Sequence, residues 1–385
     1  MKNGYQVYDK RTVPLVSSGL LNEVRRHHGF IPNAQGATVA SSKPFKAYMI
    51  LDGMTRERRI SIMKKPFQII WSAIAALAFL FTSSISFADD SRAIHVDYPL
   101  TKLNDRIYVI YGPMGEPTKA NQGFRDNISF VLTSAGIVVI DPGTSIYVGR
   151  MALKKIRTVT SKPVVAVFNT HIHGDHWLGN QAFKEAYPNV NIYAHANMIA
   201  QAKAGEGERW IKMFNDATDN AVVGTKPVVP NVAVKDGQIV TIGDVKFKIH
   251  YTGLAHSDND IMIEIPQEKA IFTGDIVRAG LVGISNSSFQ GNIKAINVAL
   301  QTRSQLFIPG HGKAGGKMVA IAYRDFIVLL RSTVAKNYDA GMPDYKMKPF
   351  VIHALADYQG WSGFKDHIGR LISLAYLEVE EDSFK

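Results

Sequence analysis

The stretch Thr170-His171-Ile172-His173-Gly174-Asp175-His176-Trp177 places three histidines and one aspartate within six positions of the chain. It follows residues 164–168, a short apolar and β-branched run after Pro163 that predicts a buried strand. A strand that ends here delivers four potential ligands onto one loop. A single histidine is usually structural, but imidazole nitrogens and a carboxylate oxygen at this spacing suit zinc, iron or manganese. The spacing therefore predicts a metal-binding loop.

Three residues further along the chain continue the pattern, namely His256, Asp275 and His311. Each follows an apolar or strand-like run, and each has glycine close by in sequence, which lets the backbone approach a ligand closely. Because one loop leaves each metal short of ligands, these residues are the expected complement of the first four. The repeated order of strand, glycine and ligand is more informative than any one instance.

Together these residues resemble the five ordered motifs of the metallo-β-lactamase superfamily of metal-dependent hydrolases, over residues 94–317. Asp141, after the apolar run 138–140, resembles the first motif, an aspartate that steadies the metal loop. The His-x-His-x-Asp-His loop resembles the second motif, and His256, Asp275 and His311 resemble the third to fifth. The resemblance implies two metal ions, one held by His171, His173 and His256, the other by Asp175, His176 and His311, with Asp275 bridging them.

Strand-rich halves that alternate with helices predict an α+β protein with two sheets packed face to face and helices outside. The resemblance specifies this as an αβ/βα four-layer sandwich with the metals at one edge. A helix is expected over 146–159, further strands over 164–168 and 191–194, and a final helix over 361–378. Pro343 and Pro349 are expected to bound a linker. His195 lies outside the motifs and is interpreted as structural.

Residues 196–230 read as a helical and then loose insertion after the metal loop. Within the superfamily such insertions often cover the substrate, whereas simple packing on the core is the alternative. Trp210 and Phe214 suit either role.

The 385-residue chain is 46% hydrophobic, ample for one large core and a smaller appendage. The formal net charge of +11 is concentrated near the amino end: residues 1–88 hold 12 Lys and Arg against 4 Asp and Glu, and residues 89–385 hold 32 against 29. No nucleic-acid partner is therefore expected. The chain has no cysteine, which excludes disulfides and thiolate ligands.

Residues 63–88 have the pattern of a secretory signal peptide, which predicts a periplasmic or secreted protein. A basic start at Met63-Lys64-Lys65 precedes the apolar run 69–81, and Ser86-Phe87-Ala88 supplies the small residues of a cleavage site. A membrane anchor is the alternative, but the run is short for about 30 Å of hydrocarbon. We therefore expect no stable anchor after cleavage.

The chain divides into four segments on this interpretation. Residues 1–62 are an over-extended reading frame or an unstructured segment, and residues 63–88 are the signal peptide. Residues 89–317 form the metallo-β-lactamase-like hydrolase domain, and residues 318–385 form a short helical extension.

The ligand set predicts a hydrolase that acts on a small molecule. Two zinc ions per chain are expected, with iron or manganese possible in the same ligands, and a metal pair lowers the pKa of bound water towards neutrality to give hydroxide. Asp175 is the expected catalytic carboxylate, because its free oxygen can orient water or carry a proton. Asp275 at the bridging position resembles the thioesterase, lactonase and glyoxalase II-like branches, which favours an ester, thioester or lactone substrate.

Two alternatives to that function are kept open. A cysteine-free subclass of β-lactamases shares the His-x-His-x-Asp-His loop, so β-lactam hydrolysis is the second candidate. A non-catalytic metal-binding protein is the third candidate function. A protein with an inactive site would be expected to lack at least one ligand, and none is missing. The sequence does not specify the oligomeric state.

Export predicts processing directly after Ala88, because small residues occupy both positions that determine cleavage. Amino-terminal sequencing of the protein purified from its host should then begin at Asp89. A mature chain that begins near Met1 would contradict both the signal peptide and the misassigned start.

Overall fold

The computed structural model describes residues 92–283 and 287–385, all of which belong to one compact unit, Ile85–Lys385. The predictions for residues 1–62 and for the signal segment 63–88 lie outside the described residues. Within the described ranges, no helix combines the length and the apolar character needed to cross a membrane.

The first half of the described chain forms a seven-stranded sheet whose strands follow one another in sequence order. Neighbouring strands from β1 to β4 are antiparallel, and those from β4 to β7 are parallel. The strands are β1 (Leu100–Lys102), β2 (Ile107–Ile110), β3 (Ile128–Leu132), β4 (Ile137–Ile140), β5 (Val164–Phe168), β6 (Asn191–His195) and β7 (Val232–Val234).

The second half forms a five-stranded sheet in the order β12-β11-β10-β9-β8. Its neighbours are antiparallel except for β11 and β12, which run parallel. The strands are β8 (Ile239–Ile242), β9 (Val245–His250), β10 (Met262–Ile265), β11 (Ala270–Arg278) and β12 (Leu306–His311).

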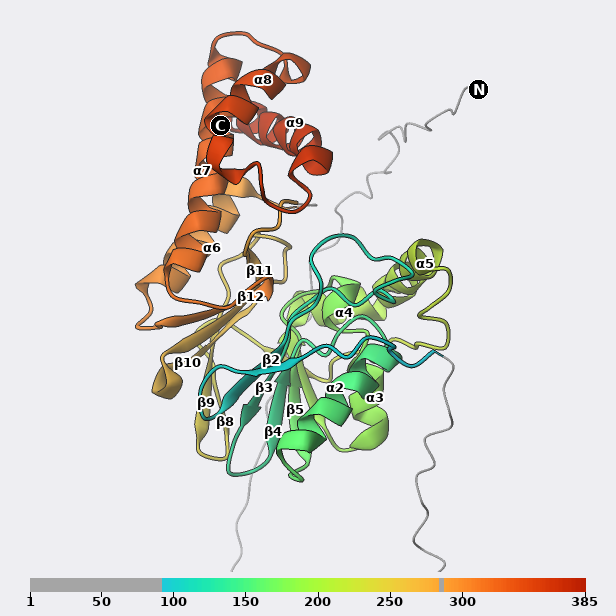
Figure 1. Cartoon of the computed structure of the whole chain (residues 1–385). Coiled ribbons are helices and arrows are strands. Elements are labelled where there is room, and N and C mark those ends of the chain that lie inside the picture. The colour runs from blue at the N-terminus through green and yellow to red at the C-terminus, as the bar shows by residue number, and fades with distance from the viewer. Residues whose placement is uncertain (1–91, 284–286) are drawn as a thin grey trace, which may run out of the picture. The chain divides into compact units, whose positions relative to one another are not determined.

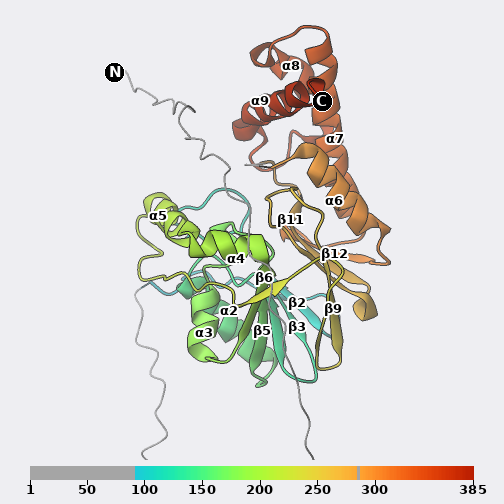
Figure 2. The ribbon, with the colours of Figure 1, turned by 180° about the vertical axis from the view of Figure 1, so that it is seen from behind.

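The two sheets pack face to face, and helices cover the outer face of each. Alternation along the strands assigns the layers: Val138 packs between the sheets with Phe247 and Phe272, whereas Val139 packs against the helices on the other side. Helices α2 (Ile146–Val159) and α3 (Asn180–Ala186) cover the first sheet, and α6 (Phe289–Gln301) and α7 (Met318–Asp339) cover the second (Figures 1 and 2). The predicted αβ/βα four-layer sandwich is confirmed.

Helix α2 occupies the residues predicted for it, 146–159. Ser145 caps its first turn by accepting a hydrogen bond from the Val148 N–H, and the buried Ile146, Leu153 and Ile156 lie on one face. The capping serine and the helical spacing of the apolar residues both lie within the segment itself. The helix can therefore be predicted from this stretch of sequence alone.

The predicted linker between Pro343 and Pro349 is wrong, because helix α8 spans Asp344–Ala354 and includes Pro349. Pro349 cannot donate to the carbonyl of Tyr345, a residue on the exposed side of the helix that is 75% exposed. The buried Met347 and Val351 hold α8 in the core shared with α7 and with α9 (Phe364–Ser383). Tertiary packing here outweighs the helix-breaking tendency of proline.

Helix α9 ends later than the predicted residue 378 and holds the start of α6. The carboxylate of Glu378 accepts hydrogen bonds from the backbone N–H groups of Phe289 (2.6 Å) and Gln290 (3.1 Å). Ser288, just before them, donates its N–H to the carbonyl of Ala255. The C-terminal helices therefore support the segment that carries His256.

Candidate metal centre

All seven predicted ligands lie where strands of the two sheets end or bend. His171, His173, Asp175 and His176 occupy the loop after β5, and His256 lies in the loop after β9. His311 is the last residue of β12, whereas Asp275 lies inside β11, at a register shift next to Gly274. Residues far apart in sequence thus meet at one edge of the sandwich.

The side chains form two groups of possible metal-binding atoms, each group lying within 4.8 Å. One group contains His171, His173, His256 and Asp275; the other contains Asp175, His176 and His311. Of these residues only His173 is not fully buried. The structure therefore brings all seven sequence-predicted ligands together, and their role as ligands stays a prediction.

In the first group the imidazoles of His173 and His256 face each other. Nδ1 of His173 lies 2.9 Å from Nε2 of His256, which in turn lies 3.5 Å from Oδ2 of Asp275. Nε2 of His171 is buried and has no hydrogen-bond partner. Buried nitrogen atoms without partners are costly, and a cation at this point would use their lone pairs.

In the second group Nε2 of His311 lies 3.4 Å from Oδ2 of Asp175. Nε2 of His176 is buried without a hydrogen-bond partner, and Oδ2 of Asp175 lies 3.7 Å from it. Asp275 also faces this group: its Oδ1 lies 3.4 Å from His176 and its Oδ2 lies 3.3 Å from His311. Asp275 therefore contacts histidines of both groups, as a bridging residue must.

Asp141 fixes the metal loop from behind. Its carboxylate accepts hydrogen bonds from the backbone N–H (2.8 Å) and the hydroxyl (2.7 Å) of Thr170, and Oδ2 lies 2.9 Å from Nδ1 of His176. A proton on that Nδ1 leaves the lone pair of Nε2 directed into the centre. Asp141 adopts the left-handed conformation, with φ of 52°, which is strained for a residue with a side chain.

The loop is also held by its own tryptophan and by the insertion that follows it. Nε1 of the fully buried Trp177 donates to the carbonyl of Ile172 at 2.8 Å. A Cβ atom at Gly174 would lie 2.6 Å from Cβ of Trp210 on helix α5 (Glu206–Thr218), so only glycine fits there. The rings of His173 and Trp210 lie 5.1 Å apart. Together with α4 (Ala196–Lys203), this insertion packs on the metal loop.

The loop carrying His256 clamps the metal loop through backbone contacts. Oδ1 of Asn259 accepts the N–H of Ile172 (2.9 Å), and the N–H of Ile261 donates to the carbonyl of Thr170 (2.8 Å). Gly253 is the glycine that precedes His256 in sequence, and a Cβ there would meet no atom within 4 Å, so the expected close approach does not occur at this glycine. Close approach is needed at Gly310, where a Cβ would collide with Asp275 Oδ1.

Burial and neighbouring charges shift the pKa values of the centre in opposite directions. Burial lowers the pKa of His171 and His256 well below the usual value, and that of His173 to about 4, which favours neutral imidazoles able to bind a metal. Burial alone would raise the pKa of Asp275 and Asp175, but the surrounding histidines hold both well below the usual value. Burial alone would lower the pKa of His176, but Asp275, Asp175 and Asp141 hold it well above the usual value. The carboxylates are therefore ionised and attract positive charge to the centre.

Three ionisable residues beside the centre, Arg125, Arg278 and Asp126, were not among the predicted site residues. Nε of Arg125 lies 3.6 Å from Asp175 Oδ2, and Nε of Arg278 lies 3.6 Å from Asp275 Oδ2. Asp126 is fully buried, and burial raises the pKa of its carboxyl well above the usual value. For Arg278 the sequence did offer a signal: a charged residue directly follows the apolar pair Ile276-Val277, three positions after Asp275.

His195, which was interpreted as structural, belongs to neither ligand group. Its ring stacks on Tyr251 with centroids 3.9 Å apart, and its Nδ1 accepts the N–H of Asn197 at the start of α4. These contacts account for its position at the end of β6.

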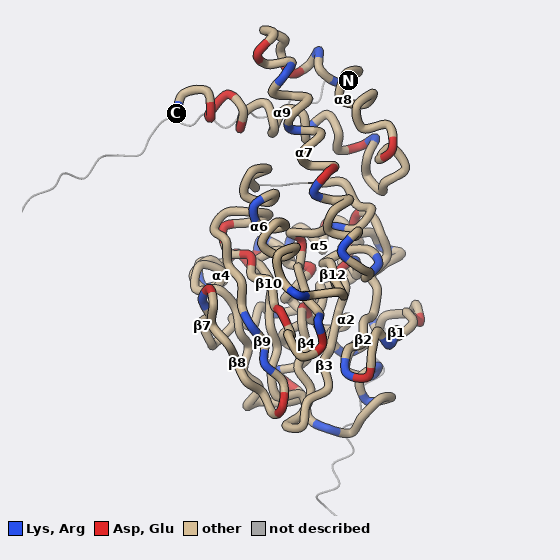
Figure 3. The backbone as a smooth tube through the Cα atoms, turned by 90° about the vertical axis from the view of Figure 1, so that its left-hand side faces the viewer, with Lys and Arg blue, Asp and Glu red and all other residues tan. Residues whose placement is uncertain are grey.

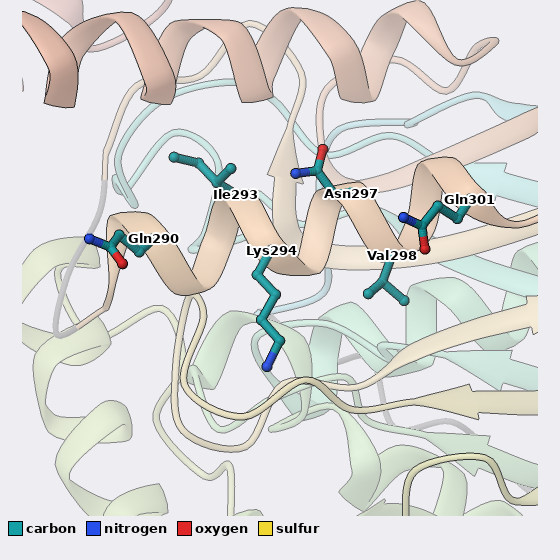
Figure 4. A pocket seen from close by; sticks show the side chains of 6 residues that line it. All are labelled: Gln290, Ile293, Lys294, Asn297, Val298 and Gln301. Atoms are coloured by element: carbon teal, nitrogen blue, oxygen red, sulfur yellow. The ribbon is translucent and has the colours of Figure 1, made fainter.

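A surface hollow of about 430 Å³ lies along α6 and contains none of the predicted ligands (Figure 4). Its one charged side chain, Lys294, donates to the carbonyl of Thr252. The lining residues are Gln290, Ile293, Lys294, Asn297, Val298 and Gln301.

Comparison with known proteins identifies the family. The family model of the metallo-beta-lactamase superfamily matches residues 123–318, just over half of the chain and the part that holds all seven predicted ligands. The protein belongs to this superfamily, as the motifs predicted.

Two curated relatives illustrate the range of activities nearby. The hydroxyacylglutathione hydrolase of Francisella tularensis subsp. novicida (strain U112) is 27% identical over 170 residues, covering 44% of this chain and 54% of that protein. The metallo-beta-lactamase IND-1 of Chryseobacterium indologenes is 26% identical over 232 residues, covering 57% of this chain and 83% of its own. The chain thus spans only about half the length of the first relative.

A solved structure shares the fold over a longer stretch. The stereoselective inverting sec-alkylsulfatase Pisa1 from Pseudomonas sp. aligns with a TM-score of 0.56 and 17% identity, covering 72% of this chain and 50% of its own. At this identity the likeness shows the fold alone.

Replacing Asp141 by Asn should weaken metal binding by about 10- to 100-fold, the usual cost of losing a residue that orients a ligand. The reason is the loss of the carboxylate that fixes both Thr170 and Nδ1 of His176. Competition with a chelator measures the affinity, and Asp105→Asn, at a side chain that is 98% exposed, is the matched control. Equal affinities in the two variants would contradict the orienting role.

Proposed function

We propose that the protein is a binuclear metal hydrolase that cleaves an ester, thioester or lactone-type bond of a small molecule. Zinc is the proposed metal, and the same nitrogen and oxygen donors also suit iron or manganese. The observation that carries the proposal is the convergence of seven ligand-type side chains in two groups, with Asp275 in contact with both.

The donor set fits two ions in three respects. The Nε2 atoms of His171 and His176 and Oδ1 of Asp275 are buried without hydrogen-bond partners. Neutral imidazoles predominate in the first group, and the carboxylates are ionised. Such an arrangement costs folding free energy unless cations compensate it, which couples metal binding to stability.

When bound, a pair of divalent ions supplies activated water at neutral pH and polarises the oxygen of the bond to be cleaved. The protein's own side chains orient the attacking water and accept its proton. Among the described residues, the Asp175 carboxylate pairs with His176 and His311 of its own group and with Arg125, and its side chain is 8% exposed. Its carboxylate is the group to which we assign acceptance of a proton from the attacking water.

β-Lactam hydrolysis is the second candidate. It is favoured by the match to the metallo-beta-lactamase of Chryseobacterium indologenes, which extends over 83% of that protein, whereas the match to the hydroxyacylglutathione hydrolase covers 54%. Thioester cleavage is favoured by the match to the hydroxyacylglutathione hydrolase, whose identity of 27% is about the same as the 26% of the β-lactamase. Loss of catalysis with retention of metal is the third candidate, but each predicted ligand is present.

We further propose export, on the pattern of residues 63–88, so that the enzyme acts in the periplasm or outside the cell. The substrate would then be a small molecule met there.

The proposal is tested on the chain from Asp89 onward. Elemental analysis after reconstitution should give close to two metal ions per chain, and a hydrolysis screen over lactams, lactones, thioesters and phosphoesters should give metal-dependent turnover. Trace metal only would overturn the binuclear centre. Full metal without turnover of any of these classes would favour the non-catalytic alternative.

Asp175 and Asp275 should differ in what their removal changes. Asp275→Ala removes the residue between the groups, so metal content and activity should fall together. Asp175→Asn keeps the shape but loses the proton acceptor, so activity should fall by about 10²–10⁴-fold even with excess zinc. Metal content and turnover are measured for each variant with and without added zinc. Full recovery of Asp175→Asn by zinc would show that the carboxylate is a ligand only.

A further inference from the structure

Arg125 connects two predicted ligands that belong to different sheets. Asp175 lies in the loop after β5 of the seven-stranded sheet, and His311 ends β12 of the five-stranded sheet. The carbonyl of Arg125 accepts a hydrogen bond from Nδ1 of His311 at 2.9 Å, and its Nε lies 3.6 Å from Oδ2 of Asp175. The same Oδ2 lies 3.4 Å from Nε2 of His311. The main chain and the side chain of one residue therefore contact two members of the second ligand group.

The main chain that carries Arg125 is fixed to the end of β12. The N–H of Asn127 donates to the carbonyl of Gly310 at 2.8 Å, and its side-chain amide donates to the carbonyl of Gly312 at 2.7 Å. These two glycines are the sequence neighbours of His311, so the hydrogen bonds lie on both sides of this ligand. Replacing the side chain of Arg125 should therefore leave the backbone contact with His311 in place.

The guanidinium group of Arg125 lies between two carboxylates. Its Nε faces Asp175, whereas its Nη1 lies 3.7 Å from Oε2 of Glu116, in the segment after β2. Oε1 of Glu116 in turn lies 3.1 Å from Nε2 of His367 on α9. A series of contacts thus runs from the C-terminal helices to the second ligand group.

Burial makes the contact with Asp175 the stronger of the two. The side chains of Arg125 and Asp175 are 13% and 8% exposed, so water screens their attraction little. Glu116 is 62% exposed, and a pair with such a group contributes little. Charged residues of both signs are interspersed over the described chain (Figure 3), and the pair of Arg209 with Glu206 is an exposed example, with Arg209 66% exposed. Arg125 differs from such pairs because its charge is buried beside a predicted ligand.

We propose that Arg125 is a positioning residue, which holds the carboxylate of Asp175 in the orientation needed both to bind metal and to accept a proton. A carboxylate turns easily about the last bond of its side chain, so its direction must be set by its neighbours. A buried positive charge beside Oδ2 restricts that rotation. Glu116 and, behind it, His367 support Arg125 from outside to a smaller extent. This inference rests on the proposed function, since that function gives Asp175 its task.

A double-mutant cycle tests whether Arg125 acts through Asp175. Hydrolysis of 4-nitrophenyl acetate by the metal-loaded protein is compared for the wild type, Arg125→Met, Asp175→Asn and the double variant. Arg125→Met alone should lower kcat about 10- to 100-fold, the usual cost of losing a residue that orients a ligand, with KM unchanged. In the Asp175→Asn background the same replacement should change kcat by less than about twofold, because the carboxylate that it positions is gone.

Bound cobalt(II) gives a readout that does not depend on turnover, because its visible absorption reports the number and arrangement of its ligands. The spectrum should differ between the wild type and Arg125→Met, and should be the same in Asp175→Asn and in the double variant. Arg125→Lys keeps the charge and should regain part of the kcat and of the wild-type spectrum. The matched control is Arg209→Met, at the exposed pair with Glu206, which should equal the wild type in both measurements.

The outer contacts predict a graded effect. Glu116→Gln should lower kcat by no more than about fivefold, since an exposed pair contributes little. His367→Gln should lower it by less than Glu116→Gln, because His367 reaches Arg125 only through Glu116. A larger loss in either variant than in Arg125→Met would contradict the proposed order of contacts.

The outcomes separate this inference from the function beneath it. If Arg125→Met costs the same factor with and without the Asp175 carboxylate, or leaves kcat and the cobalt spectrum unchanged, the positioning role is overturned and the hydrolase stands. A raised KM with unchanged kcat would overturn it too, since Arg125 would then contact substrate. A wild type that binds no metal would overturn the proposed function, and this inference with it.

Discussion

The buried carboxylate of Asp275 is the constraint on which the centre depends. It is 3% exposed and lies within 3.5 Å of His176, His256 and His311, which come from three separate segments. Burying an ionised carboxylate is expensive unless positive charge compensates it. Burial holds the imidazole of His256 neutral, and His176, whose pKa the neighbouring carboxylates raise, supplies only one positive charge. Metal ions can supply more. The structure around Asp275 is therefore one that a cation completes.

This requirement explains why the site lies where the two sheets meet. The loop after β5 belongs to the seven-stranded sheet, whereas Asp275 and His311 belong to the five-stranded sheet. Ligands from both halves can converge only while the apolar layer between the sheets holds them in register. Metal bound here would in turn join the two halves, so that stability and metal occupancy are linked.

The polar surroundings of the centre hold its predicted ligands in place. Asp141 and Asn259 use their polar atoms to fix the metal loop. Arg125 and Arg278 pair with the carboxylates of Asp175 and Asp275, each at 3.6 Å. The C-terminal helices take part indirectly, because Glu378 holds the start of α6, which packs on the loop of His256.

The sequence by itself determined what depends on local order: the loop 170–177, the helix 146–159, and the two sheets with outer helices that follow from strand-rich halves alternating with helices. His256, Asp275 and His311 were predicted because each follows an apolar or strand-like run; the structure places all three beside the metal loop, and their role as ligands stays a prediction. Only the tertiary structure decided that Pro349 lies within a helix and that Arg125 and Arg278 flank the centre. Those features depend on burial by segments distant in sequence, and neither spacing nor composition records which distant residues come together.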